Sequence, residues 1–105
     1  MQNFWMRVLV ASVELALAAV EDLDALVRTH SLPADTRARV ARSLRPLQDF
    51  PLMGPALTGR WDEFRFLLGP WRWMLLVYVV VEDEDRVVVV TIQDARSSSA
   101  TVSRI

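Results

Sequence analysis

Two apolar runs separated by four consecutive acids constrain this chain more than any other feature. Residues 71–81 are apolar apart from Arg72. The acids occupy residues 82–85, and a valine-rich run covers residues 87–92. Valine, tyrosine and tryptophan favour a pleated surface, and the acids would interrupt the apolar face of a single long helix. The pattern therefore predicts a β-hairpin. Neither run alternates cleanly between apolar and polar residues, so we expect two central strands with helices on at least one side.

The N-terminal half predicts one short strand followed by two helices. Residues 4–10 are mostly apolar and short enough for a strand, and Ser12 can cap a helix over residues 13–29. Residues 32–36 carry the proline and acid of a helix start, and Pro46 should end or kink the second helix just before it. The expected inward faces are Leu15, Ala19, Leu23, Leu26 and Val27 in the first helix, and Val40, Leu44 and Leu47 in the second.

A loop and a further strand are expected between the helices and the hairpin. Residues 49–59 contain two prolines and two glycines, which predicts an ordered loop, and its large apolar side chains predict that it packs against the core. Residues 61–68 predict a strand that turns into the hairpin at Gly69 and Pro70. The large apolar side chains of the loop are Phe50, Leu52, Met53 and Leu57.

Together these segments predict an α+β domain with the element order β-α-α-β-β-β. In this arrangement two N-terminal helices pack on a mostly antiparallel four-stranded sheet. A chain of 105 residues has room for one core, so we expect a single domain over residues 1–96. Residues 97–105 are polar, and we expect them to form a mobile C-terminal tail.

The amino-acid composition excludes several kinds of chemistry. The chain has no cysteine and one histidine, and all 12 basic side chains are arginine. Thiol catalysis, disulfides, cysteine-bound metals and lysine nucleophiles are therefore excluded. The sequence also contains no glycine-rich phosphate loop and no pair of histidines at metal-binding spacing. We expect no cofactor and no metal.

Net charge and hydropathy limit the kinds of partner that this chain can bind. The formal net charge of -1 gives no overall attraction to nucleic acid, so a nucleic-acid role needs a local patch. No segment reaches the roughly 18 to 20 uninterrupted apolar residues of a membrane span. Glu14 interrupts the early apolar run that would otherwise resemble a secretory signal. We expect a cytoplasmic protein without membrane contact, and the absence of cysteine fits a reducing compartment.

Three arginines of the C-terminal half form the first candidate site. Arg65, Arg72 and Arg96 occupy or flank three successive strands, so we expect their guanidinium groups to converge on one sheet surface and bind an anion. An arginine inside an apolar strand is costly to bury without a partner. The alternative is therefore structural, with salt bridges to Asp62, Glu63 or Asp94.

A second set of arginines lies on the second expected helix. Arg39, Arg42 and Arg45 recur every third residue and form one stripe, which suits phosphate, as in nucleic-acid binding, or an acidic partner. The more ordinary interpretation is a solvated helix surface. His30 follows the first expected helix, where a surface residue or a partner of the helix dipole is more common than a catalytic base.

Short motifs recur along the chain in a characteristic order. They are Ala19-x-x-Asp22-Leu23-x-x-Leu26, Leu47-x-x-x-Pro51-x-x-Gly54-x-x-Leu57-x-Gly59, Phe64-Arg65-Phe66, Trp71-Arg72 and Asp94-Ala95-Arg96. In this order and at these spacings they resemble the RelE/ParE toxins of bacterial toxin-antitoxin pairs. The resemblance covers most of the chain and implies the same β-α-α-β-β-β fold.

The resemblance implies a small toxin that inhibits bacterial growth and is neutralised by a cognate antitoxin protein. RelE-like members enter the ribosome and cut mRNA, whereas ParE-like members inhibit DNA gyrase and catalyse nothing. The expected target is therefore either the ribosome with its mRNA or DNA gyrase, and it stays open whether the chain is an enzyme, an mRNA endoribonuclease. The alternatives are a non-toxic, non-catalytic peptide-binding module with the same fold, and an unrelated α+β domain with structural arginines.

The resemblance also implies roles for individual residues. Arg72 matches the strand arginine that contacts the scissile phosphate, Arg65 matches one of two strand lysines, and Arg96 matches the C-terminal arginine. These three are the catalytic candidates for phosphate contact or transition-state stabilisation. The second lysine position is Glu63, Leu75 stands where the family often has tyrosine, and no aromatic residue follows Arg96. Arginine stays protonated and is a poor general base, although it can clamp a phosphate.

Overall fold

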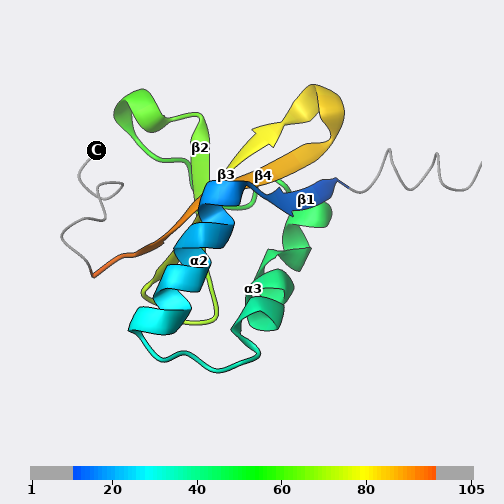
Figure 1. Ribbon diagram of the computed structural model, residues 1–105. Coiled ribbons are helices and arrows are strands. Elements are labelled where there is room, and N and C mark those ends of the chain that lie inside the picture. Colours follow the sequence, from blue (N-terminus) through cyan, green and yellow to red (C-terminus); the bar gives the residue numbers. More distant parts are fainter. Residues whose placement is uncertain (1–10, 97–105) are drawn as a thin grey trace, which may run out of the picture.

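A four-stranded sheet with two helices on one face makes up the computed structural model, which describes residues 11–96 (Figure 1). The strand order is β1-β4-β3-β2, in which β1 runs parallel to β4 and the other neighbours are antiparallel. The predicted α+β fold with a mostly antiparallel sheet is confirmed. The elements are β1 (Ser12–Leu15), α2 (Leu17–Thr29), α3 (Thr36–Leu44), β2 (Phe64–Leu68), β3 (Met74–Val81) and β4 (Arg86–Asp94).

The start of the first helix was predicted wrongly. Residues 12–15 form β1, and α2 begins at Leu17 without a side-chain cap, so Ser12 lies in a strand and caps nothing. Val13 and Leu15 lie two residues apart and both pack on the core, which is the spacing of a strand. Their partners in β4 come late in the chain, so a local pattern does not reveal this pairing. The strand expected at residues 4–10 and the tail at 97–105 lie outside the described residues.

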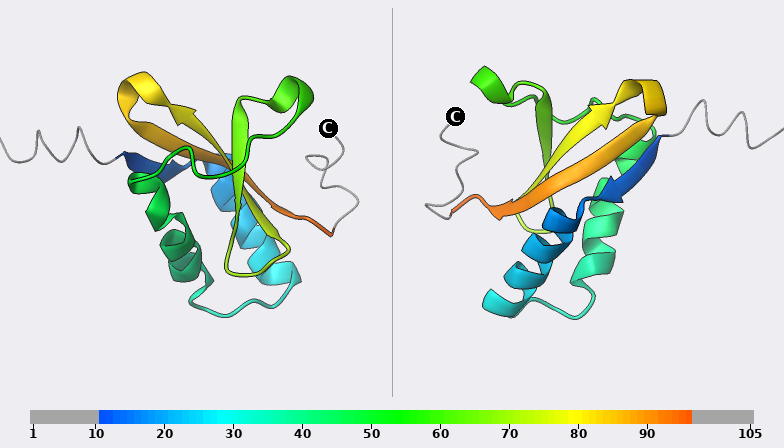
Figure 2. Two further views of the ribbon diagram at one scale, coloured as in Figure 1. Left: turned by 180° about the vertical axis from the view of Figure 1, so that it is seen from behind. Right: turned by 45° about the horizontal axis from the view of Figure 1, so that its top comes forward.

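Both helices bury the faces that the sequence predicts. Ala19 and Leu23 of α2, and Val40 and Leu44 of α3, are at most 3% exposed and belong to one core cluster. Burying a leucine-sized side chain contributes about 1.5–3 kcal/mol. The predicted end of α3 is also confirmed, because a short 3₁₀ turn containing Pro46 follows Leu44 directly. Figure 2 shows that the two helices lie side by side across the same face of the sheet.

The predicted hairpin forms the centre of the sheet. β3 and β4 are the two inner strands, and the acids at 82–85 form the tight turn between them, with Asp85 at φ 50°. A bulge leaves Val90 without a partner, since Val77 pairs with Thr91 and Tyr78 with Val89. β1 covers the outer edge of β4 only as far as Val89.

Beyond the end of β1, a carboxylate from α2 accepts hydrogen bonds from donors on the outer edge of β4. Asp22 Oδ2 accepts hydrogen bonds from the Thr91 hydroxyl at 2.6 Å and from the Ile92 N–H at 3.1 Å. Asp22 therefore ties α2 to the strand where the backbone partner runs out. No helix within residues 11–96 has the length and apolar character needed to cross a membrane.

The loop over residues 49–59 is ordered, but its apolar side chains do not hold it. Phe50, Leu52 and Met53 are 66%, 52% and 51% exposed, so the prediction that they pack against the core is wrong. Polar contacts from β2 and β3 hold the loop instead, and its last part pairs with the outer edge of β2 through the Leu57 N–H and the Phe64 carbonyl. β2 is also shorter than predicted, because residues 59–61 form a 3₁₀ turn.

Candidate functional site

Arg65 is the second residue of β2, and its guanidinium group donates hydrogen bonds to the 49–59 loop. Nη1 donates to the carbonyl oxygen of Gly54 at 2.7 Å and to that of Leu52 at 3.2 Å. The expected structural alternative was a salt bridge to Asp62, Glu63 or Asp94. The partners are main-chain carbonyls, which have no charge but accept the same N–H groups.

Tyr78 holds the same loop from β3. Its side chain is fully buried, and its hydroxyl accepts a hydrogen bond from the Gly54 N–H at 3.0 Å. Burial raises the pKa of Tyr78, while the Gly54 hydrogen bond and the charge of Arg65 act in the opposite direction. A Cβ atom at Gly54 would lie 2.4 Å from the Phe66 carbonyl oxygen, so only glycine fits here. The glycine of the loop motif is explained by this close approach.

Arg72 and Arg96 lie at a different end of the sheet from Arg65. β3 begins at Met74 and not at Trp71, so Arg72 is in the turn between β2 and β3 and is exposed. Arg96 lies two residues after the end of β4, and the Ala95 N–H between them donates to the Trp73 carbonyl at 2.7 Å. Arg65 pairs with Tyr78, four residues beyond Met74, which places it roughly 13 Å farther along the sheet. Arg72 and Arg96 therefore lie at the same end of the sheet, and Arg65 does not.

Trp73 is the centre of this end of the sheet. The Arg96 guanidinium lies 4.6 Å from the Trp73 ring centroid, and the His30 ring stacks on Trp73 at 4.7 Å. Asp94 contacts both side chains, since its carboxylate lies 3.1 Å from Arg96 Nε and 3.0 Å from His30 Nε2. The hydrogen bond from Arg96 lowers the pKa of Asp94 to about 2, with a smaller contribution from His30. His30 ends α2, as expected for a partner of the helix dipole.

The turn before β3 also reaches the arginines of α3. Trp71 and Trp73 stack with ring centroids 6.1 Å apart, and the Arg39 guanidinium lies 5.8 Å from the Trp71 ring. Arg39 and Arg42 line a shallow hollow together with Pro70 of the turn. In Figure 2 the β2–β3 turn lies beside the C-terminal end of α2. We call this region the tryptophan surface; its members are Arg39, Arg42, Trp71, Arg72, Trp73 and Arg96.

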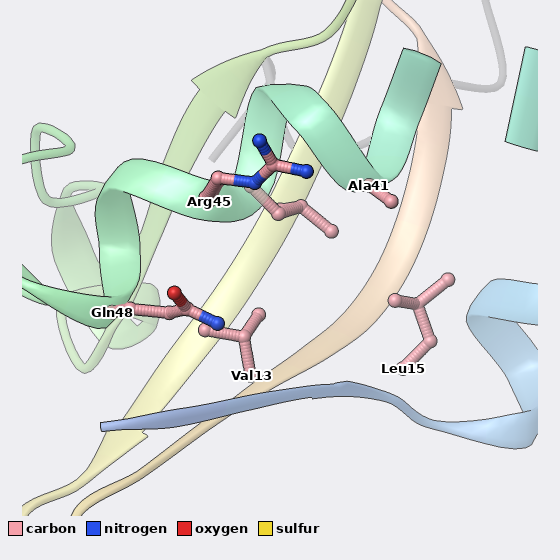
Figure 3. Close-up of a pocket in the computed structure, with 6 residues that line it drawn as sticks. Val13, Leu15, Ala41, Arg45 and Gln48 are labelled. Carbon is pink, nitrogen blue, oxygen red and sulfur yellow. The ribbon is translucent and has the colours of Figure 1, made fainter. Parts of the chain in front are cut away.

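Arg45, the third arginine of the predicted stripe, lies elsewhere. It borders a separate hollow between α3 and β1, shown in Figure 3. The sequence did not indicate that Trp71 and Trp73 connect the two arginine sets. The available signal was the spacing of the two tryptophans, which lie two residues apart and can therefore face the same side.

The tryptophan surface is suited to binding an anion. Arg39 is paired with Asp35 and Arg96 with Asp94, whereas Arg42 and Arg72 have no ion pair within residues 11–96. Aromatic rings hold the guanidinium groups of Arg39 and Arg96 in place, but Asp35 and Asp94 already accept hydrogen bonds from them. Arg42 and Arg72 are therefore the cations of this surface that are available to a ligand. An acidic protein segment or a phosphate fits this arrangement.

The surface offers little for proton transfer. Tyr78 is buried under the loop, and Asp94 is a strongly paired carboxylate with a low pKa. Both ring nitrogens of His30 are engaged, one with Thr29 at 2.9 Å and one with Asp94. His30 and Asp94, the titratable groups beside Trp73, are therefore already engaged by their neighbours.

Comparison with known proteins connects this fold to one family. Residues 13–98 match the model of the ParE toxin of the type II toxin-antitoxin system, parDE. Among curated proteins, none matches the sequence.

Solved structures share the fold at low sequence identity. The toxin-antitoxin complex RelBE2 from Mycobacterium tuberculosis is 20% identical with a TM-score of 0.63, covering 82% of this chain and 92% of that chain. The chromosomal ParDE toxin-antitoxin system from P. aeruginosa is 15% identical with a TM-score of 0.63, covering 83% and 98%. A mutant of E. coli toxin RelE in the free state is 17% identical with a TM-score of 0.62, covering 91% and 98%. The structural likeness and the family match agree, and the chain belongs to the ParE toxin family of type II toxin-antitoxin systems.

Proposed function

We propose that this chain is a growth-inhibiting toxin, that an antitoxin protein neutralises it, and that it acts by binding DNA gyrase without cutting mRNA. The observation that carries this choice is the position of Arg65. Its guanidinium group is bound to two carbonyl oxygens of the 49–59 loop, so it is held away from Arg72 and Arg96. The family match to ParE toxins supports the same choice.

Cleavage of mRNA would require groups that this chain does not present together. The resemblance to RelE-like toxins implies a set of basic side chains around the scissile phosphate. Glu63 replaces one of them, and the hydroxyl of Tyr78, the only tyrosine, is buried against Gly54. Arg72 and Arg96 remain, and arginine is a poor general base because it stays protonated.

The tryptophan surface is the proposed contact with the target. Arg42 and Arg72 are exposed and lack an acidic partner within the described part of the chain, while Arg96 is fixed over Trp73. Interfaces depend on arginine and tryptophan more than on most other residues. We assign target recognition to Arg72 and Arg96, with Arg39 and Arg42 beside them, and a structural role to Arg65.

An antitoxin partner is supported by the structural neighbours. The M. tuberculosis neighbour is a toxin-antitoxin complex, and the P. aeruginosa neighbour is a ParDE toxin-antitoxin system. We propose that the protein encoded beside this chain fills that role.

Ribosome-dependent mRNA cleavage is the second candidate. It is favoured by Arg72 and Arg96, which lie at one end of the sheet and are both suited to phosphate. A clamp of two arginines can stabilise a transition state without acting as a base.

The test begins with induction of this chain alone in a bacterial host and with co-induction of the protein encoded beside it. We expect growth arrest that the second protein relieves. Absence of arrest at verified expression would instead favour a non-toxic interaction module.

The mechanism is then decided by two assays run in parallel. The purified chain is added to a gyrase supercoiling reaction, and mRNA from arrested cells is mapped by primer extension. We expect inhibited supercoiling and no new mRNA ends. New ends within codons, together with unaffected supercoiling, would replace the gyrase proposal by mRNA cleavage.

A further inference from the structure

A hollow between β1 and α3 has an apolar floor and a basic rim. Its volume is about 270 Å³. Figure 3 shows Val13 and Leu15 rising from β1 toward Ala41 on α3 and Arg45 just after it. β1 is an edge strand, so the hollow opens at the side of the sheet. The sequence analysis gave this region no role beyond Arg45, and the tryptophan surface does not include it.

The helix that forms one wall of the hollow is strongly basic. Residues 36–48 contain four arginines and no acid. The first two are neutralised, since Arg37 pairs with Asp24 and Arg39 with Asp35. The other two, Arg42 and Arg45, are exposed, three residues apart, and lack an ion pair within residues 11–96. Of these two, Arg45 borders the hollow, and an apolar floor beside an available guanidinium group selects a ligand that carries both apolar and acidic side chains.

We propose that this hollow binds an acidic amphipathic segment of the antitoxin. An apolar side chain of that segment fills the space over Val13, Leu15 and Ala41, and one of its carboxylates pairs with Arg45. This inference rests on the proposed function, because it names where the antitoxin binds. It assigns the interaction to a flank of α3 next to the tryptophan surface but separate from Arg72 and Trp73.

Other occupants fit the hollow less well. A nucleic acid would use the arginines but not the apolar floor, and the lining residues include no aromatic ring on which a base could stack. Residues 1–10 of the chain join Ala11, whose N–H donates to the carbonyl of Gln48 at the rim, but they contain Arg7 and no acid. A second copy offers an acidic segment at residues 82–85, where four consecutive acids leave no apolar side chain for the floor.

The binding test uses the full chain and the protein encoded beside it, measured by isothermal titration calorimetry. Arg45→Glu reverses a rim charge, and Ala41→Trp fills the hollow from an exposed helix position. We expect each to weaken binding by at least about tenfold, since buried anchors and complementary charges dominate such interfaces. Arg28→Glu and Ala18→Trp are the matched controls on exposed positions of α2, and they should change the dissociation constant by less than about twofold.

A thiol probe identifies the occupant, because the chain has no cysteine of its own. A small thiol reagent should modify the cysteine of the free Ala41→Cys variant as fast as that of the Ala18→Cys control. Adding the antitoxin should slow the modification of the Ala41→Cys variant and leave the rate of the control unchanged. Slow reaction of the free Ala41→Cys chain at all concentrations would assign the hollow to residues 1–10. Slowing that grows with protein concentration would assign it to a second copy. Protection by a single-stranded oligonucleotide, without protection by the antitoxin, would assign it to nucleic acid. Each of these three outcomes overturns the inference.

Growth assays separate this inference from the proposed function. Arg45→Glu and Ala41→Trp should still arrest growth, and the antitoxin should rescue them poorly. If the antitoxin rescues both variants as well as it rescues the original chain, the toxin assignment stands and the docking site is wrong. If the original chain neither arrests growth nor binds the neighbouring protein, the proposed function fails and this inference fails with it.

Discussion

The hydroxyl of Tyr78 accepts a hydrogen bond from the Gly54 N–H at 3.0 Å inside the core. This contact joins the centre of the sheet to the 49–59 loop and lies next to the bond from Arg65 to the Gly54 carbonyl. Both polar groups of the Gly54 backbone are thereby satisfied by side chains from neighbouring strands. Hydrogen bonds from β2 and β3 therefore hold the loop on its sheet side, while Phe50, Leu52 and Met53 remain exposed to solvent.

The first prediction concerns the ionisation of Tyr78. Burial raises its pKa above the ordinary value of 10.0. The folded protein should therefore form tyrosinate at a higher pH than the same chain in urea. A raised folded-state pKa gives stability that is complete below the unfolded value and is lost as the pH rises through the folded value. Ultraviolet absorbance titration measures this directly, since Tyr78 is the only tyrosine. Coincident titrations in water and urea would contradict a buried hydroxyl.

The second prediction is that Gly54→Ala destabilises the fold. A Cβ there would lie 2.4 Å from the Phe66 carbonyl oxygen and 2.7 Å from the Tyr78 hydroxyl. Because a strand backbone cannot move freely, we expect a loss of about 2–3 kcal/mol in the free energy of unfolding. The control is Gly69→Ala, whose added atom meets mainly the flexible side chain of Met74 and should cost less than half as much. Urea denaturation compares the two, and equal losses would argue against the close approach.

Much of the fold follows from local patterns in the sequence. The helical spacing of Val40, Leu44 and Leu47 predicts their burial, and Pro46 predicts where α3 ends. The first strand is different. Leu15 fits the beginning of the helical stripe that continues through Ala19, whereas Leu15 together with Val13 has the spacing of a strand, and only the distant pairing with β4 decides between the two. Local spacing carries no information about a partner so far along the chain.

The candidate site was predictable in part. Arg72 and Arg96 are recognisable as cations near strand ends, and the structure places both at the end of the sheet where β3 begins and β4 ends, with Arg96 over the Trp73 ring. Arg65 has the same sequence character but a different role, because the loop carbonyls happen to lie within its reach. The direction of a long side chain depends on what packs beside its strand, which the alternation of residues in β2 does not specify.

The third prediction separates Arg65 from Arg72. Arg65→Met removes two hydrogen bonds to loop carbonyls and should lower the free energy of unfolding by about 2 kcal/mol. Arg72→Met changes an exposed side chain and should alter it by less than about 0.5 kcal/mol. The effects on growth arrest should be reversed. Arg72→Met should weaken the arrest, and Arg65→Met should retain it where that variant stays folded.

Arg60→Met serves as the control for the growth assay, since Arg60 is exposed and lies in the turn before β2. Full toxicity of a folded Arg72→Met chain would remove Arg72 from the proposed target contact. Loss of toxicity in a folded Arg65→Met chain would return Arg65 to the site.

The fourth prediction concerns acid stability. Arg96 holds the pKa of Asp94 at about 2, below its ordinary value of 3.8. A lowered folded-state pKa gives stability that is present above the unfolded value and is lost as the pH falls through the folded value. Asp94→Asn should therefore be less stable than the original chain above pH 3.8, and the gap should narrow toward pH 2. Urea unfolding at a series of pH values tests this. The control is Asp35→Asn, because Asp35 forms an exposed pair with Arg39. Its free energy of unfolding should differ little from that of the original chain at any pH.

The fifth prediction concerns the contact between α2 and the free part of the β4 edge. Asp22→Ala removes the acceptor of the Thr91 hydroxyl and of the Ile92 N–H in a partly buried position. We expect a loss of about 2 kcal/mol in the free energy of unfolding, because a strand N–H is left without a partner. Hydrogen exchange at the Ile92 amide should accelerate more than exchange at the β3-paired amides of β4, since only the outer edge loses its acceptor.

Asp24→Ala is the matched control for Asp22→Ala. Asp24 lies on the same helix, and its carboxylate pairs with Arg37 at the surface, so its removal should cost less than about 1 kcal/mol. The exchange rate of Ile92 should then stay unchanged. If the two variants lose equal stability and Ile92 exchanges at the same rate in both, Asp22 does not hold the strand. The position of α2 against β4 would then rest on apolar contacts such as those of Ala19 and Leu23.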